Sequence, residues 1–428
     1  MGKLTKYDSE TEDSYINLGG SYSDDRLAVI YFLWIGGVSV CSTAAVINSL
    51  EYFDHQFENH DVKFIFPLPS MIVSIIVTFI ITPLSNMLSY STRVVLTMTL
   101  VIISLCVIPF VADIFKGTMF GFFACLGILI FMGFLNNICY ASLAGFTSQI
   151  DKKYTAYFLI GIAIVGLGMS FLKIGFIYVF KQLSPNHVLD KGAVLPNALY
   201  FFTTVFMIFV GLILHAKFLR SEFYFTRVRQ RVCSVFEDEG EFALNRAEQN
   251  PATGKRDFKT LFEVYHRTRG YFWLMIVAVT QQNMFYPGLA LQKKIVGMED
   301  EDKTVSIVTT FALFFIIGKK IGQYREYYDK GTIIFCTLIR FIIIALIFVQ
   351  ARFDNIPIVE TAWFCYLNIS LLALSLGVIN VGIFILSAEL VPDDKKELSG
   401  FVSVMAVNFG SLFGGLASLA LTGHAGGH

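Results

Sequence analysis

The chain has 428 residues, of which 55% are hydrophobic and 15% charged, and its formal net charge is zero. Its mean hydropathy is +0.63, whereas a soluble globular protein carries about 25% charged residues. This composition excludes an ordinary soluble domain, and the zero net charge argues against a nucleic-acid partner.

The hydrophobic residues gather in long stretches that predict membrane-spanning helices. Each stretch has about 20 residues or more, which is the length that a helix needs to cross roughly 30 Å of hydrocarbon. Backbone groups in lipid must be bonded within a helix or a closed barrel, and these stretches are too long and too continuously apolar for barrel strands. We therefore predict an all-α polytopic membrane protein with about eleven transmembrane helices. The predicted spans are 27–52, 64–90, 93–114, 118–149, 155–181, 196–218, 270–291, 304–324, 331–351, 359–391 and 399–423.

One charged loop divides these spans into six and five. Lys and Arg are enriched in the loops on the cytoplasmic side of a membrane. With the N-terminus inside, the inner segments hold 21 Lys and Arg residues and the outer segments hold eight, so we predict an inner N-terminus and an outer C-terminus. The predicted organisation is an inner tail (1–26), a six-helix bundle (27–218), an inner charged linker (219–269), a five-helix bundle (270–423) and an outer tail (424–428).

The N-terminal tail gives little information about location. It is acidic and lacks an apolar segment, so we expect neither a cleavable signal peptide nor an Arg-rich presequence. A carrier that is imported by internal signals would have the same kind of tail. The plasma membrane, an organelle membrane and the mitochondrial inner membrane all stay open as locations.

Polar residues within the predicted spans are the candidate site residues. A charge at the centre of a span costs about 2.5–3.5 kcal/mol, so Arg340, in the middle of the ninth span, is expected to line a cavity or to bond a neighbouring helix. The seventh span carries Thr280-Gln281-Gln282-Asn283, followed by Tyr286-Pro287-Gly288. This pattern fits either a broken helix that faces a solute or a helix end at the outer interface.

Asparagines also occur near the middle of three other spans. Asn136 and Asn137 lie in the fourth, Asn380 in the tenth and Asn408 in the eleventh. An amide can recognise a neutral polar solute without the cost of a charge, and it can equally link two helices. Walker loops, paired catalytic acids, nucleophile constellations and metal-ligand spacings are absent from the sequence. We therefore expect no enzymatic activity, no cofactor, no metal and no coupling to ATP.

Taken together, these features resemble the equilibrative nucleoside transporter family, and its protist branch in particular. The six-plus-five plan with an inner loop is the layout of that family. The seventh span with its Tyr286-Pro287-Gly288 step, the Gly161-x-Ala163-x-x-Gly166 pattern and the stretch from Gly377 to Gly415 are similar to the corresponding helices. The resemblance implies a fold like that of the major facilitator superfamily, and facilitated diffusion of nucleosides or nucleobases by alternating access.

The resemblance also aligns several site positions. Asn136 lies where the fourth helix of the family usually has a glutamine, and Arg340 lies where the ninth has an arginine. The eighth helix of the family carries an Asp and an Arg one turn apart; here these positions are Ile316 and Lys320, so that ion pair cannot form. Thr43 and Ala44 replace a Trp-Asn pair of the first helix.

Two hypotheses follow from the sequence. The first is a facilitative transporter of nucleosides or nucleobases, which would bind a small neutral solute near the midplane of the membrane and contact only lipid elsewhere. Its candidate substrate-binding residues are Asn136, Gln281, Gln282, Asn283, Lys320 and Arg340. The second is a homologue without transport activity that serves as a structural subunit and contacts other membrane subunits through its 43 Phe and 19 Tyr residues. A carrier of another solute on the same fold, such as a sugar or an amino acid, is a variant of the first hypothesis.

Overall fold

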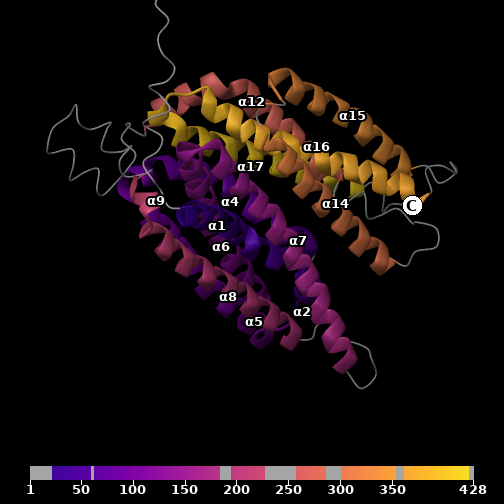
Figure 1. Ribbon diagram of the computed structural model, residues 1–428. Coiled ribbons are helices and arrows are strands. Elements are labelled where there is room, and N and C mark those ends of the chain that lie inside the picture. The colour runs from indigo at the N-terminus through magenta and orange to yellow at the C-terminus, as the bar shows by residue number, and fades with distance from the viewer. Residues whose placement is uncertain are drawn as a thin grey trace, which may run out of the picture.

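Long helices dominate the computed structural model (Figure 1). The structure describes residues 22–58, 62–183, 194–226, 257–285, 300–324, 326, 328–352 and 361–423, and every regular element in them is helical. The long helices are α1 (Tyr22–Ile47), α4 (Pro67–Met87), α5 (Tyr90–Ile114), α6 (Met119–Ile150), α7 (Lys152–Leu183), α8 (Val194–Leu219), α12 (Phe258–Phe285), α14 (Asp300–Gly322), α15 (Lys330–Arg352), α16 (Ala362–Glu389) and α17 (Lys396–Gly423). The short ones are α2 (Leu50–Gln56), α3 (Val62–Ile65), α9 (Glu222–Tyr224) and the 3-10 helix η3 (Asp393–Lys395).

Each long helix corresponds to one predicted span. Within the described residues, nine helical segments are long and apolar enough to cross a membrane. The two remaining long helices, α12 and α14, begin with charged segments that lower their mean hydropathy. The prediction of an all-α polytopic membrane protein is confirmed. The first predicted span contains one break, because α1 ends at Ile47 and the short α2 begins at Leu50.

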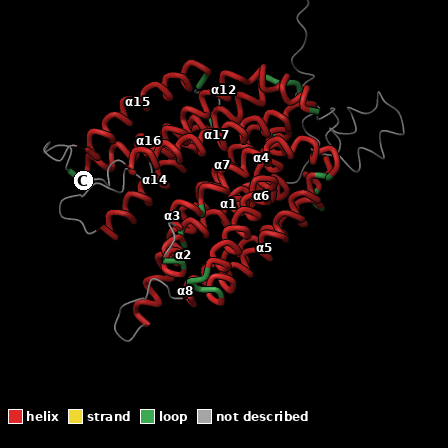
Figure 2. The backbone as a smooth tube through the Cα atoms, turned by 180° about the vertical axis from the view of Figure 1, so that it is seen from behind, coloured by secondary structure: helices red, strands yellow, loops and turns green. Residues whose placement is uncertain are grey.

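The helices pack in two sets. In the first set, α1 lies against α7 and α8, and α5 and α4 lie against α6. In the second set, α12 lies against α17, and α16 lies against α14 and α15. The sets meet where α17 packs on α6 and α4 and where α14 packs on α7. Figures 1 and 2 show that the two sets diverge toward the end where α7 finishes and α14 starts.

The packing of α1 on α7 depends on glycines that let the two backbones approach closely. A Cβ atom added at Gly161 would lie 1.9 Å from the carbonyl oxygen of Leu33, and one added at Gly36 would lie 2.1 Å from that of Phe158. Neither distance is possible for a real side chain. Small residues at such crossings are a common means of helix association in membranes. Gly166 and Gly168, further along α7, face open space instead.

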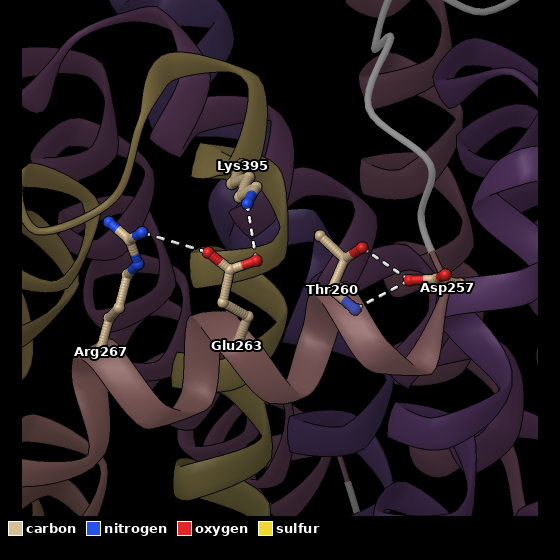
Figure 3. A network of polar contacts seen from close by, with 5 residues as sticks. All are labelled: Asp257, Thr260, Glu263, Arg267 and Lys395. Atoms are coloured by element: carbon tan, nitrogen blue, oxygen red, sulfur yellow. Dashed lines mark hydrogen bonds and ion pairs between the residues drawn. The ribbon is translucent and has the colours of Figure 1, made fainter.

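Polar contacts fix the start of α12 (Figure 3). Asp257 accepts hydrogen bonds from the hydroxyl and the backbone N–H of Thr260, at 2.6 and 2.8 Å, and these bonds lower the pKa of the Asp257 carboxyl. One turn on, the Glu263 carboxylate pairs with Lys395 of η3 at 2.7 Å and with Arg267 at 3.1 Å. The hydrogen bond from Lys395 is the main cause that lowers the pKa of Glu263. These contacts connect the beginning of α12 to the beginning of α17.

We predict that Gly161→Ala destabilises the protein and that Gly166→Ala does not. The added methyl group at 161 forces α1 and α7 apart, and overpacking of this kind costs about 1–3 kcal/mol. The methyl group at 166 enters open space, and alanine is the better helix former. Thermal unfolding in detergent should show a midpoint lowered by about 5 °C for Gly161→Ala. Equal midpoints for the two variants would contradict this close approach.

Candidate functional site

A cavity of about 400 Å³ lies where the two helix sets meet. Its wall is formed by α1, α4, α6 and α7 of the first set and by α12, α14, α16 and α17 of the second. Most of the wall is apolar, and the polar part consists of hydroxyls, one lysine and several amides. The amides are Asn136, Asn137, Gln282, Asn283, Asn380 and Asn408.

Three of the six predicted substrate-binding residues line this cavity: Asn136, Gln282 and Asn283. Asn136 is already bonded to α1, because its Oδ1 accepts from the Ser42 hydroxyl at 2.8 Å and its Nδ2 donates to the Thr43 hydroxyl at 3.2 Å. A threonine therefore supports the α6 asparagine at the position where the family usually has tryptophan. Residues 286–288, the predicted break in the seventh span, lie outside the described residues.

Arg340 and Gln281 lie behind the cavity wall rather than on it. Arg340 is fully buried, and its Nε donates to Gln281 Oε1 at 3.0 Å. Its terminal nitrogens donate to the Leu372 carbonyl at 2.7 Å, the Ser375 hydroxyl at 2.9 Å and the Ala278 carbonyl at 3.1 Å. The guanidinium therefore ties α15 to α12 and α16. Of the two expectations for Arg340, this geometry matches the bond to neighbouring helices.

The neighbouring lysines Lys319 and Lys320 of α14 point in different directions. Lys320 is exposed, donates to Gln323 Oε1 at 2.8 Å and is not part of the cavity wall. Lys319 lines the cavity with only 2% of its surface exposed, and its ammonium donates to the carbonyl oxygen of Leu159 on α7 at 2.7 Å. The basic group in the cavity is thus one residue away from the position that the sequence resemblance indicated.

Asn408 connects the two helix sets at the floor of the cavity. Its Nδ2 lies within hydrogen-bond distance of the Ser74 carbonyl (3.2 Å), the Thr78 hydroxyl (3.4 Å) and Asn137 Oδ1 (3.1 Å). Asn137 in turn donates to the Ser74 hydroxyl and to the Gly133 carbonyl. This network holds α17 against α4 and α6, so these two asparagines already have protein partners.

Two buried acceptors on the wall have no such partner. Gln282 Oε1 and Asn380 Oδ1 are enclosed and form no hydrogen bond. A buried polar atom that is left unbonded costs about 1–3 kcal/mol. Both residues line the cavity, so a rotation of either side chain that turns its oxygen toward a bound solute with N–H or O–H groups would remove this cost. Within the described residues, no group of His, Cys, Asp or Glu could hold a metal ion.

A buried ion pair joins the two sets at the end of the cavity where α6 finishes and α17 begins. Arg93 of α5 donates to Glu397 of α17 at 3.0 Å, and both side chains are almost fully enclosed. Gln149 of α6 donates to the other carboxylate oxygen of Glu397 at 3.3 Å. Beside them, a Cβ added at Gly400 would lie 2.7 Å from the Ala144 carbonyl. We call this region the closed end.

Comparison with solved structures places the fold. The Escherichia coli fucose:proton symporter is similar with a TM-score of 0.63 at 14% identity, covering 95% of this chain and 93% of that one. A proton:xylose symporter of the major facilitator superfamily has a TM-score of 0.62 at 13% identity, covering 96% and 90%. Two helix sets around a central cavity, together with these similarities, define a polytopic membrane protein with a fold like that of the major facilitator superfamily.

The family follows from the sequence comparison. The model of the nucleoside transporter family matches residues 126–422, so the chain belongs to this family. A curated relative, equilibrative nucleotide transporter 8 of Arabidopsis thaliana, is 23% identical over 168 residues, which are 39% of this chain. The match spans 41% of the length of that relative. The resemblance to the equilibrative nucleoside transporters is confirmed.

Lys319 and the Arg93–Glu397 pair are the features that the sequence interpretation missed. Lys319 could have been found from its helix face, because Phe311, Phe315 and Lys319 follow one another at intervals of four and all pack inward. The Arg93–Glu397 pair has no comparable signal. Its members are 304 residues apart, and each taken alone is a charge near the end of a predicted span.

We predict that Arg340→Met prevents correct packing of the second helix set. The substitution leaves Gln281 Oε1 without its donor and removes the bonds to the Leu372 and Ala278 carbonyls, and each buried acceptor that is left unbonded costs about 1–3 kcal/mol. The purified variant should aggregate or elute as a broad peak in size-exclusion chromatography. The exposed Arg220, directly after the end of α8, provides the control, since Arg220→Met should elute like the wild type. A stable, monodisperse Arg340→Met protein would show that the network is dispensable for folding.

Proposed function

We propose that this protein carries nucleosides or nucleobases across a membrane by facilitated diffusion. The observation that supports this most is the cavity between the two helix sets, which is lined by Gln282 and Asn380, each with an unbonded amide oxygen that could accept from the N–H groups of a base. Its remaining surface is apolar and aromatic, as a flat heterocycle requires. The membership in the nucleoside transporter family agrees with this substrate class.

The residues of the cavity divide into two roles under this proposal. Asn136, Gln282 and Asn283 contact the solute, and Lys319 takes the place that the resemblance gave to Lys320. Gln281 and Arg340 act through the wall: they hold α12 in the orientation that directs Gln282 into the cavity. A rigid support of this kind keeps a binding group in a productive position.

We propose alternating access as the mechanism, with the two helix sets as the moving bodies. For these bodies we propose the predicted bundles 27–218 and 270–423. With the N-terminus inside, the closed end is the inner end, and the structure is the outward-facing state. Solute enters where α7 and α14 diverge (Figure 1), and the Arg93–Glu397 pair must separate before it leaves on the other side.

Transport is tested by uptake of labelled adenosine and of labelled hypoxanthine into proteoliposomes. We expect saturable uptake that excess unlabelled substrate abolishes. Gln282→Leu removes a hydrogen-bonding group from the cavity at nearly constant volume and should lower the uptake efficiency about tenfold, equivalent to about 1.4 kcal/mol. Gln323→Leu makes the same substitution outside the cavity and should leave uptake unchanged.

Absence of uptake of both solutes by folded wild-type protein would contradict the proposal. It would favour a carrier of another solute or the hypothesis of a structural subunit in a membrane complex. Co-purification in a stoichiometric complex under mild detergent separates these two cases.

The closed end gives a second test. Glu397→Gln leaves the Arg93 cation buried without its anion, which costs several kcal/mol, and opening of the inner end restores water to it. Spin labels at Lys152→Cys and Asp394→Cys, in a background without the native cysteines, should therefore report a longer distance in this variant. Glu263→Gln removes an exposed carboxylate whose partners lie within the second set, so the distance should not change. An unchanged distance in Glu397→Gln would contradict the role of the pair as an inner gate.

A further inference from the structure

Among the described residues that line the cavity, one side chain is basic and none is acidic. Among the described residues that line it, Lys319 is the one charged side chain, and no described carboxylate forms an ion pair with it. Its ammonium lies 4.3 Å from the centroid of the Phe315 ring and donates one hydrogen bond, to the Leu159 carbonyl. An ammonium has three donors, so two N–H groups remain for a solute.

A buried cation without an anion is an unfavourable arrangement that a ligand can relieve. Arg340, the other buried cation nearby, has four protein acceptors, whereas Lys319 has one. Desolvation of an unpaired charge is costly, and an anion that enters the same low-dielectric space interacts with it strongly. An anionic solute beside the Lys319 ammonium would therefore complete an ion pair.

The neighbouring groups restrict what this solute is. Gln282 and Asn380 line the cavity and each has an unbonded oxygen, so a solute with N–H groups would find hydrogen-bond acceptors there. A phosphate group carries a charge of about −1.5 to −2 at neutral pH and is normally held by several basic or backbone donors. One lysine matches a single delocalised charge better than it matches a phosphate.

On the basis of the proposed transport function, we propose that the site selects a heterocyclic base in its monoanionic form over the corresponding neutral base. The chemical class is an oxopurine or similar ring whose N–H groups meet Gln282 and Asn380 while its negative charge meets Lys319. Phe315, beside the ammonium, offers a face for the ring.

Urate, which is a monoanion at neutral pH, and hypoxanthine, a neutral ring of similar shape, are the probes. Equilibrium binding of both to the purified protein in detergent is measured alongside their competition with labelled adenosine uptake. We expect urate to bind at least about tenfold more tightly than hypoxanthine. Lys319→Met should abolish this preference, and Lys319→Arg should retain most of it. Lys320→Met, at the exposed neighbouring lysine, should leave the preference as in the wild type.

Each outcome separates this inference from the transport proposal. Tighter binding of hypoxanthine than of urate, or a urate preference that survives in Lys319→Met, would overturn the monoanion inference even if adenosine uptake is normal. Tighter binding of adenosine monophosphate than of urate would overturn it in favour of a nucleotide. A Lys319-dependent urate preference without any nucleoside uptake would uphold the charge selectivity and refute nucleoside transport. Lys319→Arg also reports whether the position tolerates substitution, because a folded Arg variant that binds urate excludes a general packing defect.

Discussion

In the hydrocarbon core of a membrane, a polar side chain can bond only to protein or to a solute, and this constraint separates the structural residues of the chain from those of its cavity. Arg340 shows the first case. Its hydrogen bonds go to acceptors on α12 and α16, so the guanidinium links these helices to α15. Lys319 shows the second case, because its one hydrogen bond to the described residues goes to the Leu159 carbonyl and its other N–H groups stay available. The cost of burying a charge thus leads to rigid helix packing around Arg340 and leaves Lys319 available as a binding group.

The two helix sets pack along α17, α6 and α4 and along α14 and α7, and chemically distinct polar groups connect them at two places. Asn408 connects them beside the cavity, and the Arg93–Glu397 pair with the close approach at Gly400 connects them at the closed end. A glycine crossing such as that of α1 and α7 is intimate and apolar, and it lies within one set. A polar contact between sets can exchange its partners for water when the sets separate, whereas a glycine crossing has no such replacement. Because Gly400 makes a close approach of this kind between the sets, separation of the closed end must break this contact together with the Arg93–Glu397 pair.

Part of the site could be predicted from the sequence. The amides Asn136, Gln282 and Asn283 were identified because polar residues in an apolar span are costly, and all three line the cavity. Whether a given polar residue faces a cavity or a neighbouring helix depends on how its helix is rotated about its axis, and successive residues are about 100° apart. That rotation places Lys319 inside and Lys320 outside, and it puts Gln281 behind the wall while Gln282 lines it. Adjacent residues in one span look the same to a hydropathy pattern.

The sequence by itself determined the fold class, the positions of the long helices and the family. These follow from the length of each apolar stretch and from local motifs, which depend on lipid thickness and on residues close together in the chain. Only the tertiary structure decided which polar groups share the cavity, which are tied to protein, and that Arg93 and Glu397 close one end. Those facts depend on contacts between helices that are hundreds of residues apart, and helix packing sets such contacts through the rotation of each helix about its axis.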